Sequence, residues 1–136
     1  MATKIFINLP VKNLDKSIAF FTGLGFSFNP QFTDEKAGCM VISDNIFAIL
    51  LTEPYFQTYT KKAVSDAKTS TEVLIALDTN SKEDVQQKIA TAKKLGATIY
   101  NEPQDHGFMY VDSFADLDGH QWEFMYMDQT QVPNQE

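Results

Sequence analysis

Arginine is absent from this sequence. All 11 basic residues are lysines, set against 18 acidic residues, which gives a net charge of −7 and an isoelectric point near 4.7. The planar guanidinium of arginine is the usual partner of a carboxylate or phosphate that is held by two parallel hydrogen bonds. The acidic balance argues against nucleic acid and anionic membranes as partners. Both features disfavour polyanionic substrates.

Long apolar runs and cysteine pairs are missing too. No stretch approaches the length that spans a bilayer, and the N-terminus lacks the pattern of a signal peptide. The single cysteine, Cys39, cannot form an internal disulfide and is interpreted as a small buried hydrophobic residue. These features predict a cytoplasmic protein that does not partner a membrane. With 43% hydrophobic and 12% aromatic residues, the chain can bury a sizeable core.

The first module, assigned to residues 1–53, is predicted to contain a strand, a helix and three further strands. Asn13 or Asp15 can cap the helix, which is expected to end at Leu24-Gly25. Alternating hydrophobicity and turn residues define the predicted strands: 4–9, closed by Pro10, then 26–32, 37–43 and 46–52.

A second module, assigned to residues 70–128, repeats this order after a polar linker at 54–69. Ser81 with Asp84 resembles a helix-capping box, and this helix is expected to end at Leu95-Gly96 as the first ends at Leu24-Gly25. The remaining predictions are strands at 71–78, 97–103, 107–114 and 120–127, a short helix within the linker at 61–67, and a polar tail at 129–136.

The repeat predicts an α+β fold in which two paired βαβββ modules form a cup-shaped mixed sheet. Neither module buries both faces of its own sheet, so the two are expected to share a core. The concave surface of such a cup is a natural place for a small-molecule ligand.

The C-terminal hairpin concentrates the candidate chemistry. Two aromatic-rich runs flank the turn at residues 115–119, and an Asp-Gly step between such runs is a hairpin signal. Alternation puts Glu123 on one face with Met125 and Met127, and places His120 on the opposite face. A carboxylate in apolar surroundings is typical of functional sites. Glu123 is therefore either a ligand or general base, or a carboxylate hydrogen-bonded to its neighbours.

Two segments, PVKNLDKSIAFFTGLGF near the start and FADLDGHQWEF near the end, resemble the glyoxalase / bleomycin-resistance / extradiol-dioxygenase superfamily, also called vicinal oxygen chelate proteins. The subgroup that the sequence most resembles is bacterial predicted lactoylglutathione lyases. The resemblance implies paired βαβββ modules, a ligand site in the cup and a homodimer.

Metal-using members of this superfamily hold a divalent ion with two histidines and two glutamates. The resemblance carries these four positions to Phe6, Leu50, Glu72 and Glu123. Phe6 and Leu50 have no donor atom, so Glu72 and Glu123 are the remaining metal candidates, to which Asn8 could add an amide oxygen. No cofactor is predicted, and a divalent metal would have two carboxylates as its main protein ligands.

Two further residues could contact a ligand in the cup. His106 lies in the loop 103–107, at the expected rim, where it could polarise a carbonyl group or remain solvated. Tyr110 could donate a phenolic hydrogen bond into the pocket or fill the core. The predicted ligand-binding set is thus Phe6, Asn8, Leu50, Glu72, His106 and Tyr110, with Glu123 as the candidate catalytic residue.

Three functions remain open at this point. The superfamily resemblance implies a glyoxalase-type lyase or isomerase, in which Glu123 takes a proton next to a carbonyl group of a small substrate. The alternative is a metal-free protein that binds and sequesters a small, partly aromatic compound, as bleomycin-resistance members do. The third is a scaffold without a ligand. The poor metal-ligand set and the absence of arginine count against the glutathione-dependent reaction.

Overall fold

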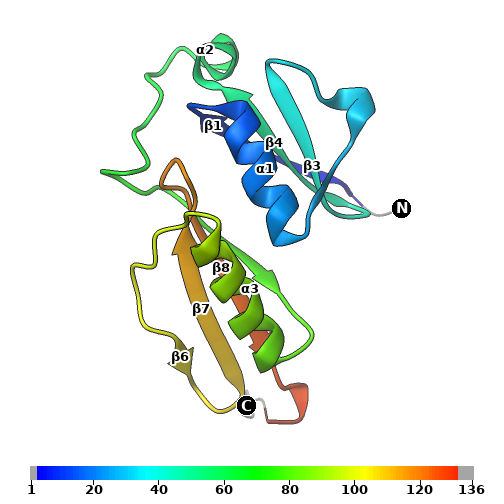
Figure 1. The fold of residues 1–136 in the computed structure, drawn as a ribbon, viewed down its shortest axis with the longest axis vertical. Coiled ribbons are helices and arrows are strands. Elements are labelled where there is room, and N and C mark those ends of the chain that lie inside the picture. The colour runs from blue at the N-terminus through cyan, green and yellow to red at the C-terminus, as the bar shows by residue number, and fades with distance from the viewer. Residues whose placement is uncertain (1–2, 132–136) are drawn as a thin grey trace. The chain divides into compact units, whose positions relative to one another are not determined.

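The structure, a computed structural model, describes residues 3–131. The chain divides into two compact units, the first ending at Asp66 and the second beginning at Ala67. Each contains a strand, a helix and three more strands, and each forms a four-stranded sheet (Figure 1). The predicted repeat of βαβββ modules is confirmed. Within residues 3–131, no helix has the length and apolar character that crossing a bilayer requires.

The first unit forms one mixed sheet with the strand order β1-β4-β3-β2. Strand β1 pairs with β4 in parallel, and the other pairs are antiparallel. A parallel pair needs a crossover between its strands, and α1 begins that connection. The elements are β1 (Ile5–Val11), α1 (Leu14–Leu24), β2 (Ser27–Phe28), the 3₁₀ turn η1 (Pro30–Phe32), β3 (Ala37–Ser43) and β4 (Ile46–Thr52).

The second unit repeats this topology, with the strand order β5-β8-β7-β6 and a parallel pair between β5 and β8. Strands β7 and β8 form the predicted antiparallel hairpin. A connection that holds α2 (Glu53–Phe56) and the 3₁₀ turn η2 (Gln57–Tyr59) follows β4. The elements of the unit are β5 (Leu74–Asp78), α3 (Lys82–Lys94), β6 (Gln104–Asp105), β7 (Met109–Ala115), β8 (Gln121–Met127) and the turn η3 (Gln129–Gln131).

Both long helices begin as the sequence predicts. The side chain of Asn13 accepts a hydrogen bond from the backbone N–H of Lys16 at 3.1 Å. Ser81 caps α3 in the same way, because its hydroxyl oxygen accepts from the N–H of Asp84 at 3.0 Å. Each cap satisfies one of the N–H groups that a helix leaves unpaired at its start.

Both long helices also end at the predicted glycines. Gly25 has φ +113° and Gly96 has φ +107°, a left-handed conformation that costs a residue with a Cβ more than glycine. The next residues, Phe26 and Ala97, donate their N–H groups back to carbonyls five residues earlier, at 3.0 Å in each case. A backbone hydrogen bond of this kind, made just after a left-handed glycine, is typical of the Schellman motif that ends many helices.

One helix covers one face of each sheet (Figure 1). In the first unit, the face toward α1 carries fully buried aliphatic side chains. In the second, the face toward α3 carries the large aromatic side chains of Phe114, Trp122 and Phe124, all fully buried. The buried members of the first set are Leu9, Val11, Met40, Ala48 and Leu50.

Two predictions for the first unit need correction. Pro10 does not end β1 but pairs with Leu51 within it. It is tolerated because β1 lies at the edge of its sheet, where a missing N–H removes no ladder bond on the open side. The strand predicted at 26–32 stops at Phe28, because Asn29 and Pro30 start η1, with the Asn29 side chain accepting from Gln31 N–H at 3.0 Å.

Two predictions after β4 are also wrong. The short helix expected at 61–67 is absent, and helical turns instead occupy Glu53–Tyr59, where Pro54 suits the first turn. The strand expected at 97–103 reduces to a single bridge between Thr98 and Ala115. Ile99 in that segment is 38% exposed, so the segment has no buried face that would hold it as a strand. Of the predicted polar tail at 129–136, residues 132–136 lie outside the described part.

Candidate functional site

Glu123 lies in the middle of the second unit's sheet. Strand β8 runs between β5 and β7, and Glu123 pairs with Ala76 on one side and Ser113 on the other. Residues directly opposite each other share a face, so the three side chains project together. The neighbouring residues Trp122 and Phe124 project toward α3 and are fully buried. The half-buried Glu123 carboxylate therefore stands on the face away from α3.

The rest of this face is mainly apolar. Met125 lies between Asp78 and Val111, and Met127 pairs with Met109. We call this surface the Glu123 face; it consists of Leu74, Ala76, Asp78, Gln104, Met109, Val111, Ser113, Ala115, Gln121, Glu123, Met125 and Met127. Its charged side chains are carboxylates, and none of these residues is a lysine. The methionines are flexible and polarisable, which suits contact with ligands of varied shape.

The β7–β8 turn holds a second carboxylate, which was not among the residues predicted from the sequence. Asp116 is 6% exposed and accepts three hydrogen bonds, from the N–H groups of Asp118 and His120 and from Nε1–H of Trp122, each at 3.0 Å. Burial raises the pKa of Asp116 above the ordinary carboxyl value, although the charge of His120 and the bond from Trp122 act in the opposite direction.

A sequence signal for this arrangement did exist. Aspartate side chains commonly accept from the backbone two residues later in a turn, and a buried tryptophan N–H needs an acceptor. The carboxylate joins the turn to the core of the sheet, because Trp122 belongs to that core. Asp116 is thus part of the framework that positions β8 and, with it, Glu123.

The other predicted residues of the second unit do not lie on the Glu123 face. Tyr110 pairs with Tyr126 on the α3 side and is 8% exposed, with Lys82 Nζ 5.0 Å from the centre of its ring. His106 is exposed in the β6–β7 turn, where its backbone N–H donates to the backbone carbonyl of Met109 at 2.8 Å. Glu72 is exposed and precedes β5.

The predicted residues of the first unit fall on two different faces. Phe6 is 51% exposed on the face away from α1 and stacks on Phe47, with ring centroids 4.9 Å apart. Asn8 lies on the same face and donates from Nδ2 to the carbonyl of Phe6 at 3.2 Å. Leu50 is 0% exposed and pairs with Leu9 on the α1 side. A fully buried aliphatic side chain has no surface for a ligand, so Leu50 belongs to the core.

The residues of β4 that share a face with Phe6 are Phe47, Ile49 and Leu51. Like Leu50, these three side chains have no atom that can bind a metal ion. Strand β4 therefore offers no metal-binding side chain on either of its faces. Within residues 3–131, no three or more His, Cys, Asp or Glu side chains lie together as a metal-binding group.

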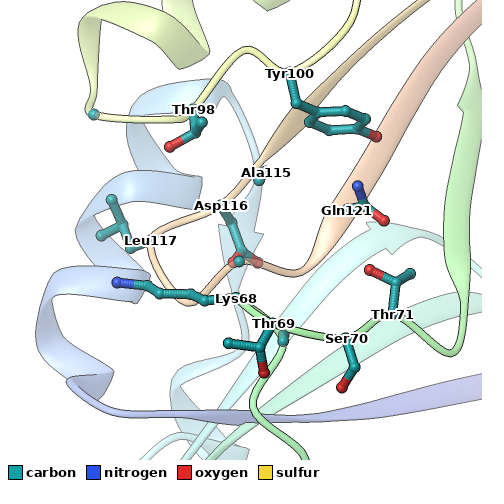
Figure 2. A pocket seen from close by; sticks show the side chains of 13 residues that line it. Lys68, Thr69, Ser70, Thr71, Thr98, Tyr100, Ala115, Asp116, Leu117 and Gln121 are labelled. Carbon is teal, nitrogen blue, oxygen red and sulfur yellow. The ribbon is translucent and has the colours of Figure 1, made fainter.

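The second unit also contains a polar pocket of about 580 Å³ (Figure 2). It lies beside the β7–β8 turn, between the segment that leads into β5 and the segment that follows α3. Its lining includes Ser70, Thr71, Thr98, Tyr100 and Gln121. Gln121 is the one of these five that belongs to the Glu123 face, and none of the five was predicted from the sequence.

The superfamily model described as "Glyoxalase/Bleomycin resistance protein/Dioxygenase superfamily" matches residues 5–124. The chain belongs to this superfamily. The solved structures similar to it include a hypothetical protein from S. aureus, with 30% sequence identity and a TM-score of 0.79 over 93% of this chain and 94% of that one. No protein with a curated description matches the chain.

Two further similar structures are more distant in sequence. A glyoxalase/bleomycin resistance protein/dioxygenase family enzyme from Burkholderia phytofirmans PsJN has 17% identity and a TM-score of 0.77, covering 93% of this chain and 99% of that one. The fosfomycin resistance protein FosX from Listeria monocytogenes has 20% identity and a TM-score of 0.69, covering 96% and 97%. At these identities the likeness concerns the fold alone. The superfamily model confirms the predicted superfamily, and the similar structures confirm the predicted fold class.

Proposed function

We propose that this protein binds a small, partly apolar organic molecule on the Glu123 face and does so without a resident metal ion. The observation that carries the proposal is the position of Glu123, a half-buried carboxylate between the small side chains of Ala76 and Ser113. The exposed Ala76 leaves one side of the carboxylate accessible, whereas Ser113 on the other side is buried. Half-buried methionines two and four residues further along β8 supply apolar contact area.

The charges of this face define the ligand class. Its ionisable side chains are Glu123 and Asp78, and the chain as a whole carries a net charge of −7. An anionic ligand would meet repulsion and no guanidinium fork, whereas a ligand with an ammonium or N–H group would donate to Glu123. The expected ligand is therefore neutral or cationic, with an apolar or aromatic part.

A matched pair of probes tests this proposal. Phenethylamine and phenylacetate share an aromatic ring and differ in the sign of their charge. The protein is labelled with ¹³C at its methionine methyl groups, three of which (Met109, Met125 and Met127) lie on the Glu123 face, while Met40 is buried in the first unit. Phenethylamine is expected to shift the signals of the three and to leave that of Met40 unchanged. Phenylacetate is expected to bind at least about fivefold more weakly.

Two variants complete the test. Glu123→Gln keeps the shape of the side chain and removes its charge, and is expected to weaken phenethylamine binding at least about fivefold. Glu83→Gln removes an equivalent charge from the exposed start of α3 and is expected to have no effect on binding. Equal binding of both probes, or an unchanged affinity in Glu123→Gln, would refute the proposal. Sedimentation of the same samples tests the homodimer that the resemblance implies.

The second candidate is a glyoxalase-type lyase acting on a small carbonyl compound, which superfamily membership favours. In that reaction Glu123 would act as the base, and a cation would stabilise the enediolate. A turnover assay with lactoylglutathione and added nickel, zinc or magnesium distinguishes the two candidates. Turnover that Glu123→Gln abolishes, together with metal bound in stoichiometric amount, would favour the lyase over the binding protein.

A further inference from the structure

The polar pocket beside the β7–β8 turn has one wall that is fixed by close backbone contact. This wall is the segment Ala67–Thr71, which we call the strap. Gly119 has φ +95°, and a Cβ placed there would lie 2.8 Å from the backbone nitrogen of Lys68 and 2.9 Å from the carbonyl group of Ala67. Only glycine permits this approach. The start of the strap is therefore packed directly on the turn.

The opposite wall is held by backbone hydrogen bonds. Thr98 N–H donates to the carbonyl of Ala115 at 2.9 Å, and Ala115 N–H donates to the carbonyl of Thr98 at 2.8 Å. This pair of bonds attaches the segment after α3 to the end of β7, and Tyr100 follows two residues later. Both walls thus rest on the hairpin, so the pocket is formed before a ligand arrives.

Three side chains on one side of this pocket offer hydrogen bonds without charge. Figure 2 shows the Tyr100 hydroxyl, the Gln121 amide and the Thr71 hydroxyl along the same side of the pocket. Within residues 3–131, the side chains of these three have no hydrogen-bond partner in the protein. Hydroxyl and amide groups can each donate and accept. The set matches a ligand whose own groups also do both.

Two side chains of the lining, Asp116 and Lys68, are charged, but neither is positioned to bind an ion beside Gln121. Asp116 is almost fully buried and already accepts three N–H groups. The Lys68 ammonium lies, in the view of Figure 2, on the side of the pocket away from Tyr100 and Gln121. An anion beside Gln121 would meet no positive charge there, and Asp116, the one carboxylate among the lining residues, is already occupied by its three N–H donors.

We propose that this pocket is a second binding site, distinct from the apolar part of the Glu123 face, and that it takes a neutral polyhydroxylated molecule such as a sugar ring. Its volume of about 580 Å³ falls within the usual range for small-molecule sites, roughly 300–1,000 Å³. The ring of Tyr100 adds an apolar surface for the carbon-bound face of such a molecule. Tyr100, Gln121 and Thr71 fix its orientation.

The test is an NMR titration of the full ¹⁵N-labelled chain. The probes are methyl β-D-glucopyranoside and myo-inositol, with inorganic phosphate as the charged comparator. At least one neutral probe is expected to give saturable shifts at the amides of Thr71, Thr98, Tyr100 and Gln121, with a millimolar Kd. Gln121→Leu and Tyr100→Phe are each expected to raise that Kd at least about fivefold, the usual effect of losing a hydrogen bond.

Two controls make the result specific. Gln31→Leu removes an exposed glutamine from the first unit and is expected to leave the Kd unchanged. Glu123→Gln is expected to leave it unchanged as well, so this site and the function proposed above can fail independently. Saturable binding of phosphate alone would overturn the proposal. Linear, non-saturating shifts with both neutral probes, or equal weakening by Gln31→Leu, would do the same.

Discussion

The two units share one topology but close their central hairpins in different ways. In the first unit, the β3–β4 turn at residues 43–45 is made of polar side chains at the surface. In the second, the β7–β8 turn folds around the buried carboxylate of Asp116, which reaches the core through Trp122. A βαβββ module therefore does not require a buried turn. The second unit has an additional anchor at the end of the strand that carries Glu123.

The two units also differ in whether the helix or the strands supply the bulky side chains of the core. Helix α1 buries the large side chains of Phe20, Phe21 and Leu24, whereas α3 buries Val85, Ile89 and Ala92. In the second unit the bulk comes from the strands, as the buried Trp122 shows. Protein cores are packed to nearly constant density, so a helix with small residues needs large ones opposite. Large residues on one face of β8 leave its other face free to carry Glu123.

The largest expected difference between the units concerns their turns. Asp116→Ala leaves three N–H groups without their acceptor in a buried place, and we expect it to lower the free energy of unfolding by about 3–4 kcal/mol. Asp44→Ala changes an exposed turn and is expected to cost less than about 0.5 kcal/mol. Urea denaturation followed by circular dichroism measures both. Comparable losses would show that the turns are equivalent after all.

The next comparison concerns two glycines with positive φ. Gly119→Ala is expected to lower the free energy of unfolding by about 2–3 kcal/mol. The new Cβ would collide with the backbone of Ala67 and Lys68, and the alanine would also be strained by its positive φ. Gly25→Ala has no atom within 4 Å of its Cβ and is expected to cost about 1 kcal/mol of backbone strain alone. Fluorescence of the single tryptophan, which belongs to the second unit, reports on the Gly119 variant. Equal costs would mean that the strap does not pack on the turn.

The smallest changes in stability are expected at the N-caps of α1 and α3, a feature that the two units share. Asn13→Ala and Ser81→Ala each remove one N-cap hydrogen bond, of 3.1 Å and 3.0 Å. Each is expected to lower the free energy of unfolding by about 1 kcal/mol, and the two costs should match within about 0.5 kcal/mol. Asn13→Ser and Ser81→Asn, which keep a capping oxygen, should restore most of the loss in the same urea experiment. A large difference between the two caps would break the equivalence of the modules.

Local patterns in the sequence predicted the elements that depend on nearby residues. The caps at Asn13 and Ser81, the glycines that end both helices, and the hairpin at 115–119 all rest on interactions a few residues apart. Strands β3 and β4 were predicted with the correct bounds. The segment at 97–103 failed because alternation indicates a strand only if a buried face is available to it, and Ile99 has none.

The candidate site was predicted in part. Glu123 was identified, and its opposition to the aromatic face of β8 follows from alternation alone. Leu50 was predicted to line the ligand site together with Phe6. Strand β4 is apolar on both faces, so its sequence does not show which of its residues pack against α1. The register with β1 decides this point, and it sets Leu50 beside Leu9.

By itself, the sequence determined the repeated βαβββ order, the superfamily and a carboxylate among apolar neighbours. These follow from periodicity, capping residues and turn chemistry, all of which act over short distances. Only the tertiary structure decided the contact between the strap and Gly119, the side of the sheet that Tyr110 occupies and the polar pocket at Gln121. Each of these depends on segments far apart in the chain that meet through strand register and close backbone approach, which single-sequence patterns do not encode.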